Sequence, residues 1–171
     1  GRLLDLWNQI EVKKVAGLEG TLRMPLARMG TDAGALGGLV VNEGGRSGRV
    51  TVFLDPASAE SQKLLPSLRV LSRTHRLELI FVPAQPARAG VSQALICDAS
   101  FATAFFERGT VPVPQLEQST CGREGLERAR VTVQLLGIQT LPFTVAANGA
   151  TVAGHPNDYA EFVTSNQEAR R

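Results

Sequence analysis

Apolar and polar positions along this chain change their period several times, and each period predicts a different kind of element. Residues 50–54 form a short β-branched and aromatic run with apolar side chains on both faces, which is typical of a central strand covered on two sides. A helical period follows from Ser58 to about Arg73, and its apolar stripe is rich in leucine: Leu64, Leu65, Leu68 and Leu71. Residues 77–82 return to the strand pattern, so the chain predicts an α/β arrangement.

A helical insertion is predicted at about 88–137. Within it, apolar residues recur at helical spacing over 90–108 and again over 122–137. The proline-rich stretch 110–114 between them cannot be helical throughout, because proline removes a backbone donor and clashes with the preceding turn. The insertion is therefore expected to hold helices joined by irregular chain.

After the insertion, the pattern predicts a β-hairpin and a closing helix. Residues 143–147 and 151–153 flank Asn148-Gly149, a dipeptide that favours the tight turn of a hairpin. Residues 158–164 then carry a short helical period. The hairpin completes a mixed sheet, and we expect residues 49–171 to form one domain.

The first 48 residues follow a different pattern. Apolar side chains at i, i+3, i+4 and i+7 predict a helix over residues 3–14: Leu3, Leu6, Trp7 and Ile10. Residues 20–49 are rich in glycine and hold short apolar pieces such as Leu39–Val41, which allow one short strand or hairpin. Residues 1–48 are therefore expected to form a helix and a glycine-rich connection.

Composition limits the classes of protein and of partner. The chain has 171 residues, enough for one ordinary core, and its 43% apolar and 20% charged residues are usual for a globular protein. No apolar run approaches the roughly 20 residues that a membrane-spanning helix needs. The net charge of +2 is small and the basic residues are scattered, so we expect neither nucleic acid nor membrane insertion.

Few residues are available for metal chemistry. The chain has two cysteines, Cys97 and Cys121, and two histidines, His75 and His155. They lie far apart and match no ligand spacing of a zinc site, so we expect no metal and no cofactor. From the residues alone, the cysteines are either two separate buried thiols or a disulfide.

One junction carries the most specific signal in the chain. Residues 52–56, Val-Phe-Leu-Asp-Pro, end the first predicted strand, and Ser58 and Ser61 follow in Ser-x-x-Ser spacing at the start of the helix. Pro66 lies five residues beyond the second serine, where it should bend that helix. Much later in the chain, residues 140–142, Thr-Leu-Pro, precede a predicted strand.

Together these features resemble the catalytic domain of the periplasmic disulfide isomerases, the DsbC/DsbG family of the thioredoxin superfamily. In that family, Cys-x-x-Cys occupies the positions of Ser58 and Ser61, and a cis-proline loop like that at Pro142 lies against it. Cys97 and Cys121 bracket part of the insertion, as a second, structural cysteine pair does in DsbC itself. The resemblance implies a thioredoxin-like fold, a structural Cys97–Cys121 disulfide and a periplasmic or other extracytoplasmic location.

The resemblance also implies a surface that binds polypeptide substrates. In the family, the cis-proline loop pairs with the substrate backbone beside the active-site helix. The corresponding residues here are Ser58, Ala59, Glu60, Ser61, Leu141 and Pro142. Leu141 departs from the family, which usually has threonine before the proline, and this changes the side chain that meets the substrate backbone.

The chemistry of the family needs two thiols that this junction lacks. A thiolate attacks a disulfide sulfur and forms a mixed disulfide, which a second thiol resolves. A helix N-terminus favours the thiolate because its backbone N–H groups and its dipole stabilise negative charge. A serine hydroxyl is far less acidic and forms no disulfide, so the site is expected to be redox-inactive and no catalytic residue is assigned. Ser58 can still cap the helix.

A serine hydrolase is a weaker interpretation of the same junction. Ser58 would need a base within hydrogen-bond reach and an oxyanion hole, and His155 is a candidate for the base because it follows the hairpin. The chain has no Gly-x-Ser-x-Gly elbow, so loop or surface roles are favoured for both histidines.

Three functions are compatible with the sequence. The first is a non-catalytic, chaperone-like or assembly protein of the cell envelope, which has lost redox chemistry and kept polypeptide binding. The second is an active thiol-disulfide isomerase or oxidoreductase whose Cys-x-x-Cys has been replaced by serines in this chain. The third is a structural module of a larger envelope complex, with residues 20–49 packing on a partner.

The expected partners follow from these functions. They are polypeptide clients or envelope-complex proteins. A homodimer is also expected, through the predicted N-terminal helix or a segment upstream of it, because the isomerases carry a dimerisation domain there. The alternative is that the N-terminal helix packs on its own domain.

Overall fold

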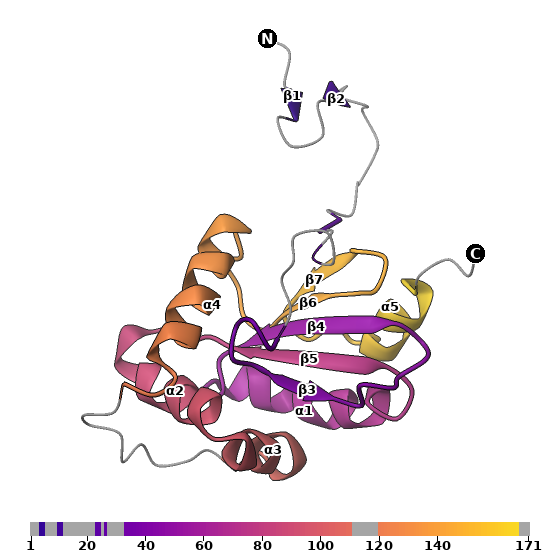
Figure 1. Ribbon diagram of the computed structural model, residues 1–171. Coiled ribbons are helices and arrows are strands. Elements are labelled where there is room, and N and C mark those ends of the chain that lie inside the picture. Colours follow the sequence, from indigo (N-terminus) through magenta and orange to yellow (C-terminus); the bar gives the residue numbers. More distant parts are fainter. Residues whose placement is uncertain are drawn as a thin grey trace.

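The computed structural model describes residues 4–5, 10–11, 23–24, 26, 33–110 and 120–167. Its centre is a five-stranded sheet in the order β3-β5-β4-β6-β7 (Figure 1). The strands are β3 Leu39–Val41, β4 Arg49–Leu54, β5 Arg76–Phe81, β6 Phe143–Val145 and β7 Thr151–Ala153. β4 and β5 run parallel, and the other neighbouring strands run antiparallel. The prediction of an α/β fold with a mixed sheet is therefore confirmed.

Helices pack on both faces of this sheet. They are α1 Ala59–Leu71, the 3-10 helix η1 Pro86–Arg88, α2 Ala89–Cys97, α3 Ala99–Arg108, α4 Arg123–Leu135 and α5 Tyr159–Ser165. The single helix predicted over 90–108 is two helices, because the backbone of Asp98 is extended and its side chain accepts the Ser100 N–H. The chain bends by 107° between the segments Pro86–Cys97 and Ala99–Arg108.

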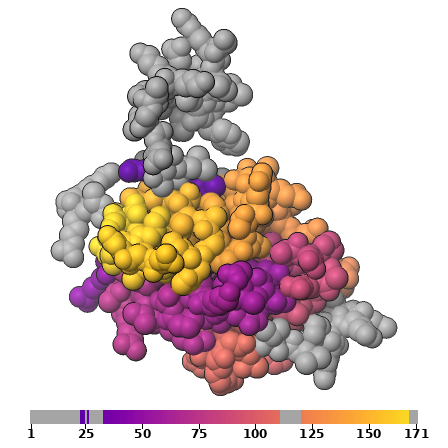
Figure 2. Space-filling model, turned by 180° about the vertical axis from the view of Figure 1, so that it is seen from behind, coloured from indigo at the N-terminus to yellow at the C-terminus, as the bar shows by residue number. Residues whose placement is uncertain are grey.

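Two hydrophobic clusters lie one on each face of the sheet, and the first of them holds α1 in position. Side chains alternate along β4, so Val52 and Leu54 face one cluster and Phe53 faces the other. The first cluster contains the leucine stripe of α1, and each fully buried leucine contributes roughly 1.5–3 kcal/mol. The second cluster contains Ala129 of α4 and Met24 of the N-terminal part. Figure 2 shows the yellow C-terminal part of the chain against the purple and magenta part that holds β4 and α1.

The predicted helix over residues 3–14 is wrong at the four positions that the structure describes there. Leu4–Asp5 and Ile10–Glu11 are short strands, β1 and β2, which pair antiparallel with each other. The sequence also carries a period of two at this place, because apolar Ile10 and Val12 are separated by a polar residue, and β-branched side chains favour strands. The remaining positions of the predicted helix lie outside the described residues.

Two short predictions are confirmed elsewhere in the sheet. Asn148-Gly149 joins β6 and β7, and Gly149 has φ +85°, a left-handed conformation that favours glycine. The short strand allowed within the glycine-rich connection is β3, which pairs antiparallel with β5. The proline-rich stretch at 110–114 lies outside the described residues except for its first position.

The sheet topology also bears on the predicted division of the chain into residues 1–48 and 49–171. β3 comes from residues 1–48 and joins the same sheet as the strands of 49–171, while the division into these two parts stays a prediction. No single helix in the described part of the chain is long and apolar enough to cross a membrane. Among the described residues, the bent pair of η1–α2 and α3 reaches that length and composition only when its two segments are taken together.

Candidate functional site

The junction between β4 and α1 places Ser58 at the N-cap of the helix, with extended backbone. Its carbonyl oxygen accepts the Gln62 N–H at 3.1 Å, and its own N–H donates to the carbonyl of Asp55 at 3.0 Å. Its hydroxyl makes no capping hydrogen bond, so Ser58 caps the helix by position and backbone rather than by its side chain. Ser58 is half-buried, and its hydroxyl lies where the helix dipole favours negative charge.

Ser61 belongs to a buried hydrogen-bond network one turn further along the helix. It is fully buried, and its Oγ accepts the backbone N–H of Asp55 at 3.1 Å. The Asp55 carboxylate is also buried and accepts the N–H of Ala57 at 2.9 Å and that of Ala84 at 3.1 Å. Charge-assisted bonds of this kind hold the start of α1 to the chain that leaves β5.

The surface between the two serines is exposed and charged. Ala59 and Glu60 are exposed, and the Glu60 carboxylate lies 2.6 Å from the Lys63 ammonium group. An exposed pair of this kind contributes little stability, but the carboxylate in the first turn suits the helix dipole. Of the predicted surface, Ala59 and Glu60 are therefore exposed and Ser58 is half-buried, whereas Ser61 is buried.

The Leu141–Pro142 peptide bond is cis, which agrees with the resemblance drawn from the sequence. Pro142 is buried and Leu141 is half-buried. β6 pairs antiparallel with β4, and Phe53 stands opposite the first residue of β6. The same register, extended by one residue, sets Pro142 opposite Leu54. Since the chain runs from Leu54 directly into the turn before Ser58, the cis bond and the start of α1 lie at the same end of the sheet.

His155 lies at this end of the sheet too. The N–H of the preceding residue, Gly154, donates to the carbonyl of Pro142 at 2.7 Å. His155 is exposed, and its ring stacks on Tyr159 with centroids 6.1 Å apart. Within the described residues, the Ser58 hydroxyl makes no hydrogen bond to His155, so the geometry gives no support to a hydrolase pair.

Cys97 and Cys121 form a disulfide in the structure, with Cα atoms 5.5 Å apart. Cys97 is the last residue of α2 and Cys121 stands before α4, so the bond joins two helices of the insertion. Gln93 of α2 adds a hydrogen bond from Nε2 to the carbonyl of Cys121 at 2.7 Å. The disulfide therefore lies on elements other than the one that carries the two serines.

Sequence reasoning does not identify two residues that build the site. Asp55 is visible in the Leu-Asp-Pro motif, and a carboxylate directly after a buried strand is the signal that could have marked it. Arg88, at the end of η1, donates from Nη1 to the carbonyl of Ala57 at 3.4 Å. Arg88 and Ala57 are 31 positions apart, and no local sequence pattern relates them.

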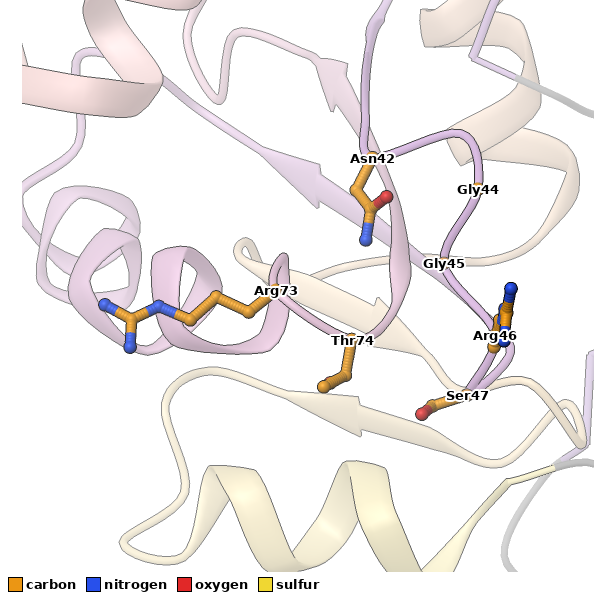
Figure 3. Close-up of a pocket in the computed structure, with 7 residues that line it drawn as sticks. All are labelled: Asn42, Gly44, Gly45, Arg46, Ser47, Arg73 and Thr74. Atoms are coloured by element: carbon orange, nitrogen blue, oxygen red, sulfur yellow. The ribbon is translucent and has the colours of Figure 1, made fainter.

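A separate pocket of about 300 Å³ lies at the other end of the sheet (Figure 3). It is formed by the turn after β3 and the turn between α1 and β5, and its lining is Asn42, Gly44, Gly45, Arg46, Ser47, Arg73 and Thr74. The Arg73 side chain extends away from the other lining residues (Figure 3). Since β4 begins beside this pocket and ends before Ser58, the pocket is not part of the site at the α1 N-terminus.

No cluster of three or more His, Cys, Asp or Glu side chains among the described residues could hold a metal ion. The structure brings the two predicted parts, the Ser58–Ser61 turn and the Leu141–Pro142 loop, to one end of the sheet.

Comparison with known proteins gives relatives only at the level of structure. No protein-family model matches the chain, and no curated protein matches it. A disulfide interchange protein from Neisseria gonorrhoeae is similar with a TM-score of 0.64 and 21% identity, over 79% of this chain and 99% of that one. ScsC from Proteus mirabilis, in a compact conformation, is similar with a TM-score of 0.66 and 16% identity, over 86% of this chain and 80% of that one.

The catalytic domain of the same Proteus mirabilis protein is similar with a TM-score of 0.60 and 14% identity, over 79% of this chain and 97% of that domain. These likenesses cover most of each structure at low identity. They establish the fold, which is thioredoxin-like, and this part of the prediction is confirmed.

Proposed function

We propose that this thioredoxin-fold chain is a non-catalytic polypeptide-binding protein of the cell envelope, with a chaperone-like or assembly role. It retains the binding surface of a disulfide interchange protein and lacks the redox thiols. The observation that carries this proposal is the position of Ser61, which is fully buried with its Oγ accepting the Asp55 N–H. A thiol at this position is a weaker acceptor, so the serine suits the junction better than a cysteine does.

The available sulfur chemistry supports the same function. The chain has two cysteines, and both are used in the Cys97–Cys121 disulfide. No thiol is therefore left to attack a client disulfide or to resolve a mixed one. The hydroxyls of Ser58 and Ser61 do not replace a thiol in this reaction, because a serine oxygen can neither form nor resolve a disulfide.

The proposed binding mode uses the end of the sheet where Ser58 and Pro142 lie. An extended client segment runs along the cis-proline loop, with its backbone beside Leu141 and its side chains towards the start of α1. Leu141 is half-buried and offers apolar contact, and Glu60 with Lys63 forms a charged rim. Unfolded polypeptides, which expose backbone and apolar side chains together, are the matching class of client.

A location outside the cytoplasm is part of the proposal. Disulfides persist in oxidising compartments and are rare in the cytosol. The Cys97–Cys121 bond joins two helices of the insertion, and Cys121 is exposed, so a reducing compartment would open it. An envelope location keeps the insertion cross-linked.

Redox assays separate this function from its alternative. The chain and its Ser58→Cys/Ser61→Cys variant are compared in insulin reduction and in refolding of scrambled ribonuclease. The proposal expects no turnover by the unmodified chain and no turnover by the variant. Turnover by the variant alone favours the alternative, an isomerase or oxidoreductase whose cysteines have been replaced by serines in this chain.

Client binding is tested with a fluorescent, reduced and alkylated polypeptide whose anisotropy rises when it is bound. Leu141→Glu places a charge in the proposed apolar contact and should weaken binding about tenfold. Leu135→Glu is the matched control. Leu135 is the last residue of α4 and is 80% exposed, so this variant should leave binding unchanged. Circular dichroism confirms that both variants fold. Equal affinities for the two variants would overturn the proposed surface.

A further inference from the structure

Two arginines lie side by side at the start of the two central strands. Arg49 is the first residue of β4 and Arg76 is the first residue of β5, and the parallel register makes them direct neighbours. Both side chains reach the same buried carboxylate, that of Glu78, so they lie on one face of the sheet. Like charges that are neighbours on one face of a sheet destabilise it, so the pair needs a compensating anion.

Glu78 supplies part of this compensation. It is fully buried, and its Oε1 accepts a hydrogen bond from Nε of Arg76 at 3.1 Å. Its Oε2 accepts the Thr51 hydroxyl at 3.3 Å and lies 3.7 Å from Nη1 of Arg49. Arg76 and Thr51 thus give each carboxylate oxygen a hydrogen bond, and Arg49 is not needed to pair Glu78. One carboxylate lies beside two guanidinium groups, which leaves one positive charge uncompensated.

Most hydrogen-bond donors of the two guanidinium groups remain available. Each group carries five N–H donors. Among the described residues, Arg76 directs one of these donors to Glu78, and the guanidinium of Arg49 makes no hydrogen bond. The side chains of Arg76 and Arg49 are 38% and 27% exposed, whereas that of Glu78 is 0% exposed. A ligand can therefore reach the arginines but not the glutamate.

The surroundings of the pair are basic and lie away from α4. That helix packs on the same face of the sheet beside the last residues of β4 and β5, whereas the two arginines are the first (Figure 1). Arg46, in the turn before β4, is exposed and lines the pocket at this end of the sheet (Figure 3). Residues 42–49 and 73–78 together carry four arginines and two glutamates: Arg46, Arg49, Arg73, Arg76, Glu43 and Glu78. This end of the sheet is therefore positively charged.

We propose that Arg49 and Arg76 bind a carboxylate group of an acidic polypeptide partner. Guanidinium groups bind carboxylates through parallel, charge-assisted N–H···O bonds, and two neighbouring arginines offer enough donors for both oxygens. One carboxylate balances the single positive charge that Glu78 leaves, whereas a phosphate dianion would bring an excess of negative charge beside a buried glutamate. Four arginines against two glutamates leave an excess of two positive charges over the two turns, which suits a partner segment with more than one acidic residue.

The anisotropy of a short fluorescent oligoglutamate peptide tests this site on the whole chain, and an oligoglutamine peptide of the same length should not bind. Arg49→Gln removes one guanidinium and leaves Glu78 paired with Arg76, so it should weaken binding of the acidic peptide about fivefold. Arg128→Gln is the matched control, because it removes the same charge from an exposed position of α4, and it should leave the affinity unchanged. Equal affinities of the two variants, or equal binding of the two peptides, would overturn the proposal.

Glu78→Gln gives a readout that a merely structural role of the arginines would not move. The amide keeps the size of the side chain and still accepts the Arg76 hydrogen bond, but it removes the negative charge. The acidic peptide should therefore bind about fivefold more tightly to this variant. Glu127→Gln, at an exposed position of α4, changes the net charge equally and should leave the affinity unchanged. Circular dichroism confirms that the variants fold.

Two results of this second comparison would overturn the proposal. One is an affinity that is the same in Glu78→Gln and Glu127→Gln. The other is inorganic phosphate that binds the unmodified chain more tightly than the acidic peptide does. The site needs neither Ser58 nor Leu141, so its failure would leave the proposed client-binding function standing.

Discussion

At the scale of single residues, Ser58 and Ser61 look alike in the sequence and differ in the structure. Ser61 is fully buried, and its Oγ accepts the backbone N–H of Asp55. Ser58 is half-buried, and its hydroxyl makes no capping hydrogen bond. Ser61 therefore contributes a buried hydrogen bond to the junction, whereas the Ser58 side chain contributes no capping bond.

This difference predicts unequal costs for the two alanine variants. Ser61→Ala leaves the buried Asp55 N–H without an acceptor and should lower the free energy of unfolding by about 1–3 kcal/mol. Ser58→Ala removes no side-chain hydrogen bond and should have a much smaller effect. Urea unfolding followed by circular dichroism measures both, and a larger loss for Ser58→Ala would contradict the structure.

His75 is a buried titratable residue away from the proposed site. It is 2% exposed, and its Nε2 has no hydrogen-bond partner. Burial lowers the pKa of His75 below its ordinary value of 6.5, against a smaller raising effect of the backbone hydrogen bond with Leu71. Between the lowered pKa and pH 6.5, His75 therefore binds a proton more readily in the unfolded chain than in the folded one.

The stability of the protein should accordingly fall as the pH drops through 6.5 towards the lower folded-state pKa. Well above pH 6.5, His75 is neutral in both the folded and the unfolded chain, and its contribution to the free energy of unfolding is complete. Urea unfolding at about pH 7.5 and about pH 5.5 measures the loss. His75→Gln should reduce this pH dependence, whereas His155→Gln, at the exposed histidine, should retain it. Identical pH profiles for the two variants would show that His75 does not carry the effect.

At the scale of elements, helices and strands are predicted best where one hydrophobic period is strong in the sequence. β4, β5 and the β6–β7 hairpin follow from apolar runs bounded by clear turn residues. At the four described positions of the helix predicted over 3–14, strand pairing is found instead, and the sequence there carries two competing periods. The break at Asp98 is missed because the apolar spacing continues across it, although aspartate is a good N-cap residue.

The candidate site was predictable only in part. The Ser-x-x-Ser turn and the proline loop are recognisable by motif, and the β4–β6 register brings them to one end of the sheet. The Asp55 and Arg88 contacts join segments about thirty residues apart, and such contacts arise only when β4 and β5 pair. Long-range hydrogen bonds of this kind leave no periodic signal in a sequence.

The disulfide makes a prediction for the helical insertion. It joins residues 24 positions apart, in α2 and before α4, and chain-entropy arguments assign about 3.5 kcal/mol to a loop of this length. Cys97→Ser/Cys121→Ser should lower the free energy of unfolding by that order while leaving the sheet intact. Thermal unfolding by calorimetry measures the loss, and an unchanged melting temperature would show that the bond does not stabilise the fold.

At the scale of the whole molecule, one thioredoxin-like sheet carries separate surfaces. The proposed client site occupies the end where β4 leads into α1. The disulfide lies in the helical insertion. Because these surfaces fall on different elements, each is testable by variants that leave the others unchanged.

The central claim is that this chain binds polypeptides and transfers no electrons to their disulfides. One experiment measures both properties on the unmodified chain: titration with a fluorescent polypeptide that contains a disulfide, followed by thiol quantification in the presence of a reductant. The account predicts saturable binding with reduction no faster than the reductant achieves alone. Accelerated reduction, or an absence of binding, would contradict it.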